Sequence, residues 1–195
     1  MNSRKPTAER RTEIADAAIK IIGERGLREF TAAQIAEEVG IKDGTIFRHF
    51  KDMQEIVAAV FDRIEEILTS RAPSRKSDPL ERLEAFFMDR LRAVATQPGL
   101  LSLIFSDQLA HAMGNEGVRR LARLRDAGRE QIRGCLREAE GAGLISKGTD
   151  IESAVLLING MAMSVLFASK DGALDAPIEK VARRTWKTLL DMLRR

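Results

Sequence analysis

The chain has 195 residues, 44% of them hydrophobic and 31% charged, a composition that supports one or two folded domains and excludes a disordered chain. Its net charge of +3 permits nucleic-acid binding without requiring it, and the single cysteine, Cys135, excludes an internal disulfide. The longest apolar run, 154–168, is interrupted by polar and small residues and is shorter than a membrane span. Because the N-terminus is polar and basic rather than signal-like, we expect a cytoplasmic protein.

Helical periodicity runs through the whole chain, and the first 71 residues predict four helices. The first helix carries an apolar stripe from Ile14 to Ile22 and ends at Gly26. The second begins after Thr31, which forms a candidate capping box with Gln34. The predicted ranges are about 7–25, 32–39, 43–50 and 52–71.

The remaining residues predict a loop at 72–77 and then five further helices. Asp78 and Pro79 mark one helix start, since aspartate caps well and proline suits the first helical position. Thr149 and Glu152 are expected to cap a later helix. The fold class is therefore all-α with about nine helices, the last five at about 78–97, 100–113, 116–140, 150–170 and 177–193.

The stretch Thr31–Phe50 has the steric features of a helix-turn-helix. Ala36 is small where two helices would cross closely, and Gly40 lies at the turn, where a positive φ is easy for glycine. Ile35 and Ile46 are expected to point back into a three-helix core. The pattern therefore predicts a DNA-binding domain, and a helical hairpin that touches no DNA is the alternative.

In this geometry the third helix enters the major groove with its N-terminal residues near the base edges. Basic and hydroxyl side chains there can contact guanine acceptors or phosphates. Helix N-termini present N–H groups suited to phosphate, and Gly44 lets the backbone come close to DNA. The candidate DNA-binding residues are Thr31, Lys42, Asp43, Gly44, Thr45, Phe47, Arg48, His49 and Lys51.

Three ordered motifs lie within 11–61: I-x-x-A-A-x-x-I from Ile14, T-x-x-x-I-A-x-x-x-G from Thr31, and G-T-I-F-R-H-F from Gly44. Together they resemble the DNA-binding domain of the TetR (tetracycline-repressor) family of bacterial regulators. The family usually has tyrosine at the position of Phe47, so this chain lacks a hydroxyl that would donate to phosphate.

The resemblance implies a homodimeric repressor that binds a palindromic operator in double-stranded DNA and leaves it when a small molecule enters the C-terminal domain. On that basis residues 1–51 form the DNA-binding domain and 52–195 the ligand-binding and dimerisation domain, with the fourth helix, 52–71, connecting the two. The family also often has lysine at the position of Met53, and Lys51 is the candidate substitute.

Aromatic residues concentrate between the DNA-binding segment and the last helices. A pocket lined in this way suits an apolar or amphipathic ligand, whereas ordinary core packing is the alternative. The candidate pocket residues are Phe61, Ile64, Leu68, Phe86, Phe87, Leu101, Phe105 and Asn159.

The last two helices combine small and apolar residues, which allow close helix packing. The resemblance implies that such a pair forms a four-helix bundle with its twin, and an intramolecular core is the alternative. The candidate dimer residues are Leu156, Gly160, Met163, Phe167, Trp186, Leu189, Leu190 and Leu193.

Catalysis finds no support in the sequence, which holds no phosphate loop, Rossmann fingerprint or nucleophile elbow. Neither His49 nor His111 follows a glutamate at three residues, and one cysteine with two histidines does not make a usual zinc site. We therefore expect no enzyme activity, no cofactor and no metal. The alternative function is a helical protein-interaction adaptor, or a nucleoid-associated DNA binder of the same fold without a small-molecule inducer.

Overall fold

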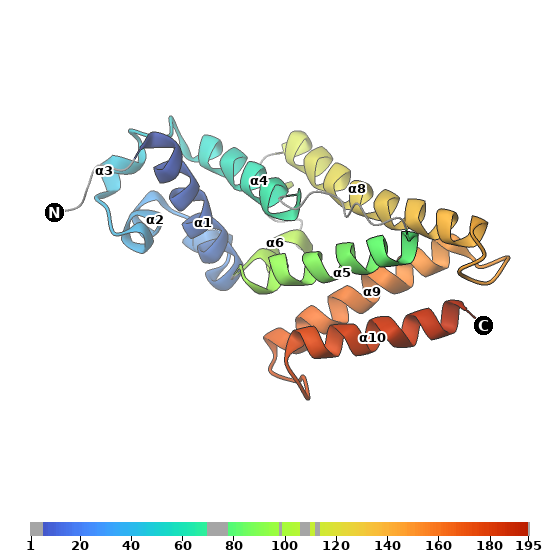
Figure 1. The fold of residues 1–195 in the computed structure, drawn as a ribbon. Coiled ribbons are helices and arrows are strands. Elements are labelled where there is room, and N and C mark those ends of the chain that lie inside the picture. Colours follow the sequence, from blue (N-terminus) through green and yellow to red (C-terminus); the bar gives the residue numbers. More distant parts are fainter. Residues whose placement is uncertain (1–5, 70–77, 98, 106–109, 112–113, 195) are drawn as a thin grey trace. The chain divides into compact units, whose positions relative to one another are not determined.

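The computed structural model describes residues 6–69, 78–97, 99–105, 110–111 and 114–194 (Figure 1). These residues form nine α-helices, a short 3-10 helix and no strand, which confirms the all-α prediction. The helices are α1 (Thr7–Arg25), η1 (Leu27–Glu29), α2 (Ala32–Val39), α3 (Asp43–Ile46), α4 (Met53–Thr69), α5 (Pro79–Ala95), α6 (Leu100–Phe105), α8 (Gly114–Gly141), α9 (Ile151–Lys170) and α10 (Ile178–Leu193).

Side-chain caps set several of the helix starts. The Thr31 hydroxyl accepts a hydrogen bond from the Gln34 backbone N–H at 3.2 Å, as predicted. The Gln34 side chain does not complete a capping box, because its oxygen accepts from Arg25 instead. Asp78 accepts from the N–H groups of Leu80 and Glu81 and so caps α5.

Two expectations about helix ends were wrong. The cap of α9 is Asp150, whose carboxylate accepts from the Ser153 N–H at 3.1 Å, whereas the Thr149 hydroxyl donates back to a carbonyl of the preceding loop. The third helix ends at Ile46 and not at Phe50, because the chain tightens into a turn over 47–49. The predicted loop at 72–77 and most of 106–113 lie outside the described residues.

The chain divides into two compact units, residues 1–70 with 97–123 and residues 71–96 with 124–195. The first unit extends beyond the predicted DNA-binding domain of 1–51, because α4 and α6 both pack against α1. The assignment of functions to either side of residue 51 remains a prediction. Each unit is described by itself below.

In the first unit α1 is the central helix, and its side chains Ile14, Ala18 and Ile19 are all 0% exposed. The backbone of α1 touches the segment before α6 without an intervening side chain. A Cβ added at Gly23 would lie 2.0 Å from the Cα of Gly99, far inside van der Waals contact. This approach therefore requires glycine on both sides.

In the second unit α5, α9 and α10 pack on one another. Phe87 of α5 stacks on Trp186 of α10 with ring centroids 5.5 Å apart. Both side chains are 2% exposed, and Trp186 is the only tryptophan of the chain. This aromatic pair lies in the core of the unit.

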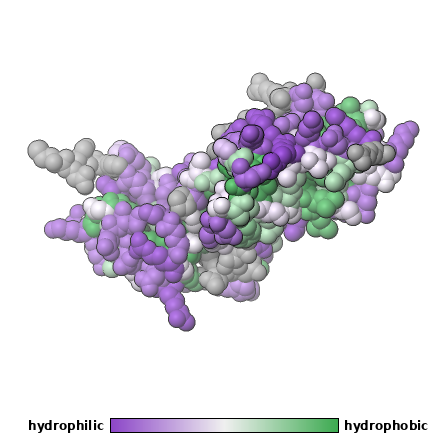
Figure 2. Space-filling view, turned by 90° about the horizontal axis from the view of Figure 1, so that it is seen from below, coloured by the Kyte–Doolittle hydropathy of each residue, from purple (hydrophilic) through white to green (hydrophobic). Residues whose placement is uncertain are grey.

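Helix α9 has nearly the predicted bounds of 150–170 and is strongly apolar. By length and composition alone its 20 residues could cross a membrane, a test that a core helix of a soluble protein also passes. Only 28% of its most apolar window is buried inside the protomer. Figure 2 shows hydrophobic surface, in green, between hydrophilic areas, and the exposed large hydrophobic residues include Leu156, Leu157 and Phe167 of α9.

Candidate nucleic-acid interface

The predicted turn between α2 and α3 is present. Gly40 ends α2 in the left-handed conformation with φ 72° and ψ 38°, and the Ile41 N–H donates to the Ala36 carbonyl at 2.9 Å. Ile35 and Ile46 are both 0% exposed, so each short helix is anchored in the core by one isoleucine. The opposite face of α3 is directed away from the packed helices α1 and α2 (Figure 1).

The outward face of α3 and the following turn gather the candidate contact residues. Lys42, Arg48 and Lys51 are exposed. Their three positive charges outnumber the single negative charge of Asp43. Phe47 is 49% exposed, unusual for a large aromatic ring, while Phe50 is 2% exposed. A cationic surface with an exposed ring suits a polyanion with apolar groove walls.

Gly44 is not needed for the internal packing of the protein. A Cβ at this position would meet no atom within 4 Å, and its φ is not positive. A bare backbone at this exposed helix start leaves room for close approach of DNA, and a contact there remains a prediction. Thr45 beside it is half-buried, and Thr31 is exposed at the N-terminus of α2.

Arg11 of α1 was missed by the sequence analysis. Its guanidinium lies 4.0 Å from the ring centroid of Phe50, pairs with Glu55 at 2.9 Å and donates to the His49 carbonyl. Glu55 also accepts from the Lys51 N–H at 2.6 Å, and the pKa of Glu55 is lowered by this bond and by Arg11. One arginine thus joins α1, the end of the α3 turn and α4, over sequence separations that no local motif reveals.

His49 is a candidate contact residue that is only partly accessible. The residue is half-buried, and its Nδ1 atom is buried without a hydrogen-bond partner in the described part of the chain. Its carbonyl is held by Arg11. A direct role of this imidazole at DNA remains a prediction.

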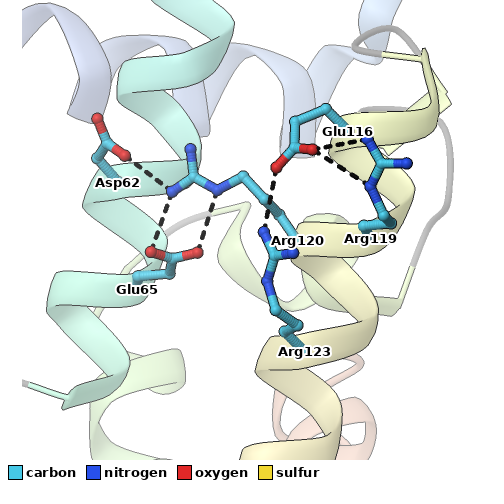
Figure 3. Close-up of polar contacts among 6 residues, drawn as sticks. All are labelled: Asp62, Glu65, Glu116, Arg119, Arg120 and Arg123. Carbon is cyan, nitrogen blue, oxygen red and sulfur yellow. Dashed lines mark hydrogen bonds and ion pairs between the residues drawn. The ribbon is translucent and has the colours of Figure 1, made fainter.

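Ion pairs tether α4 on two sides within the first unit. Arg63 pairs with Asp16 of α1 at 2.7 Å, and the hydrogen bond that Arg63 donates to Asp16 is the main reason that the pKa of Arg63 is raised. Arg120 of α8 pairs with Asp62 at 2.8 Å and Glu65 at 3.0 Å (Figure 3). The helix that follows the turn is therefore fixed to both α1 and the start of α8.

The eight candidate pocket residues fall on both units, so the pocket remains a prediction. In the first unit Phe61, Ile64 and Leu101 are buried and Leu68 is half-buried, while the Phe105 side chain lies outside the described residues. In the second unit Phe86 is half-buried, Phe87 stacks on Trp186, and the Asn159 amide donates to the Val155 carbonyl at 2.8 Å.

The eight candidate dimer residues separate by helix. On α9, Leu156 is 67% exposed, Phe167 is 40% exposed, Gly160 is exposed and Met163 is half-buried. On α10, by contrast, the candidates are mostly buried within the protomer: Trp186, Leu189 and Leu193 are buried, and Leu190 is half-buried. The available apolar surface therefore lies on α9, with Met192 of α10 66% exposed as well.

Residues 14–60, which contain α2, the Gly40 turn and α3, match the family model described as bacterial regulatory proteins, tetR family. The chain is 27% identical over 192 residues to the HTH-type transcriptional repressor KstR2 of Rhodococcus jostii, covering 94% of this chain and 91% of that protein. It is 28% identical over 159 residues to the fatty acid metabolism regulator protein of Bacillus subtilis, covering 76% and 77%.

Among solved structures, the ketosteroid transcriptional regulator KstR2 of Mycobacterium tuberculosis has a TM-score of 0.80. The alignment covers 100% of this chain and 97% of that one at 21% identity, so it shows that the two chains share a fold. Residues 14–60 thus form a DNA-binding domain of the tetR family of bacterial regulatory proteins, and the chain is similar to a named transcriptional repressor over nearly its whole length. The chain is a DNA-binding transcriptional regulator and not an enzyme, in agreement with this match and with the named repressor.

Proposed function

We propose that the protein is a dimeric repressor that binds a palindromic operator through α3 and is released from it by a small amphipathic molecule. The observation that carries the proposal is the cationic α3 surface, with a bare Gly44 backbone, held outward by the Gly40 turn. A protein of this kind acts on DNA in the bacterial cytoplasm.

Footprinting on the DNA that flanks the protein's own gene tests this function. We expect a short protected palindrome whose half-sites lie roughly 34 Å apart, the spacing of successive major grooves. Diffuse protection at every sequence would instead support the alternative, a nucleoid-associated binder of the same fold. Absence of protection would support a protein-interaction adaptor.

The exposed stripe on α9 supports a two-fold dimer. Leu156, Gly160 and Phe167 recur at helical spacing along one face, and a Cβ at Gly160 would meet nothing within 4 Å of its own protomer. An apolar stripe with a bare glycine at its middle suits close packing against a second copy of the same helix. Dimerisation would also cover the part of α9 that the protomer leaves exposed.

Leu156→Asp will convert the dimer to a monomer, because association would bury an unpaired carboxylate in each half of an apolar contact. We expect the dissociation constant to rise by roughly 100-fold or more. Sedimentation at several concentrations measures it. Val118→Asp is the matched control, since Val118 is an exposed hydrophobic residue of α8 at 42% exposure. A Leu156→Asp protein that remains dimeric would move the interface away from α9.

The class of ligand is suggested by the names of the relatives, which refer to fatty acid metabolism and to ketosteroids. Fatty acids and ketosteroids are both apolar or amphipathic small molecules. We therefore propose a lipid-like ligand for this protein.

Release would act through α4, which directly follows the α3 turn. Because Arg63 ties α4 to α1 and Arg120 ties it to α8, a shift of α8 pulls on the helix that positions α3. For ligand to release DNA it must bind the DNA-free dimer more tightly, by a few kcal/mol for a strong switch. Equal affinity of a ligand for the free and DNA-bound dimers would contradict this mechanism.

A further inference from the structure

Arg90 of α5 is a half-buried cation for which the described residues supply no ion-pair partner. Its Nε atom is buried and has no hydrogen-bond partner among the described residues. Burial lowers the pKa of Arg90. An unpaired buried charge is destabilising and is normally matched by an anion.

Several other arginines of the second unit are paired. Arg133 contacts Glu152 at 2.6 Å, and Arg184 contacts Asp175 at 2.7 Å. Arg92, two residues along the same helix, contacts Asp89 at 3.3 Å. The unmatched guanidinium of Arg90 is therefore a local feature that a general excess of positive charge does not explain.

The surroundings of Arg90 hold the guanidinium in place. It lies over the ring of Phe86, 5.1 Å from the centroid, one of the residues predicted to line a pocket. On the other helix, a Cβ at Gly128 of α8 would come within 2.9 Å of its Nη2 atom. The missing side chain at Gly128 thus provides the space that the guanidinium occupies.

A second unmatched donor lies in the same unit. The Nε1 atom of Trp186 is buried and has no hydrogen-bond partner in the part of the chain that the structure describes. Trp186 stacks on Phe87, and Arg90 lies over the adjacent Phe86. Both groups only donate hydrogen bonds, so both call for an acceptor that the described protein does not supply.

We infer that Arg90 anchors the anionic head of an amphipathic ligand, a carboxylate or a phosphate on an apolar body that packs against Phe86. The inference rests on the proposed ligand-released repressor and adds the charge of its ligand. A guanidinium can donate two parallel hydrogen bonds to either head group, which a neutral side chain cannot.

Three probes with the same twelve-carbon chain test the inference: laurate, dodecyl phosphate and 1-dodecanol. Trp186 emission reports binding, since the chain has one tryptophan and no tyrosine. We expect the wild-type protein to bind at least one anion roughly tenfold or more tightly than the alcohol. The stronger of the two anions identifies the head group as carboxylate or phosphate.

Two variants of Arg90 separate charge from packing. Arg90→Met should lose the preference for the anion and keep its affinity for 1-dodecanol, whereas Arg90→Lys should keep part of the preference. Arg92→Met, which removes a paired arginine from the same helix, should behave as the wild type. Without ligand, Arg90→Met should melt at a higher temperature, because it removes an unpaired buried charge; a structural ion-pair role would lower the melting temperature instead.

Three results would overturn the anchor: equal binding of anion and alcohol by the wild type, an unchanged preference in Arg90→Met, or binding of none of the probes. Gel shifts on operator DNA with the same samples test the proposed function separately. If the anions bind selectively but never release DNA, the Arg90 site stands and ligand-controlled repression fails. If DNA is released equally by anion and alcohol, repression stands and the Arg90 site fails.

Discussion

Gly23→Ala will destabilise the protein strongly. The new Cβ would lie 2.0 Å from the Cα and 2.4 Å from the carbonyl oxygen of Gly99, and backbone atoms cannot rotate away as a side chain can. We expect a loss on the order of 3 kcal/mol in the free energy of unfolding. For a chain of this size that corresponds to a melting temperature lower by roughly 6–12 °C, measurable by circular dichroism.

Gly134→Ala is the matched control for this prediction. Gly134 lies inside α8, where a Cβ would meet nothing within 4 Å. Alanine is the better helix former by about 1 kcal/mol, so this variant should melt slightly higher than the wild type. If Gly23→Ala were as stable as Gly134→Ala, α1 and the segment before α6 would not be in the close contact described.

Arg48→Ala and Lys42→Ala will each weaken operator binding by ~1–3 kcal/mol if the side chain contacts a base. Both side chains are exposed on the α3 surface. Loss of a base contact reduces affinity for the operator more than for unrelated DNA. Loss of a phosphate contact weakens both and lowers the salt slope by about one unit. Fluorescence anisotropy at several salt concentrations with both DNAs distinguishes the two cases.

Lys147→Ala provides the comparison for a change of net charge alone. Lys147 is exposed in the loop between α8 and α9, in the unit that does not contain α3. It should leave operator affinity close to that of the wild type. Unchanged affinity in both α3 variants would remove Lys42 and Arg48 from the interface and place the DNA contact elsewhere.

Local chemistry explains why so much of the fold was predictable. The N-cap of Thr31 and the positive φ of Gly40 depend on residues within one or two turns, and both were predicted. The errors have the same local origin: Thr149 and Asp150 are adjacent candidate caps, and only the backbone geometry decides that Asp150 bonds the Ser153 N–H. The short α3 was overestimated because the apolar Phe50 continues the pattern after the helix has ended.

The exposed position of Arg48 follows from the recognisable motif, and its contact with DNA remains a prediction. Arg11 was missed because its partners, His49 and Glu55, lie 38 and 44 residues away. Periodicity predicts α9 and α10 equally as dimer helices. In the structure, Trp186 of α10 is instead buried in the core of its own protomer. The spacing of apolar residues along the sequence does not show whether a side chain packs within its own protomer or against a partner.

The placement of the lone indole has a use beyond packing. Since the chain has no tyrosine and Trp186 belongs to the second unit, the unit that carries α3 has no tyrosine or tryptophan of its own. Any change in tryptophan emission on adding operator must therefore arise in the second unit, which does not contain α3. Because thermodynamic linkage is reciprocal, a change in Trp186 emission on adding operator would show that DNA binding affects the unit that holds the proposed ligand site. This measurement needs no added fluorescent label.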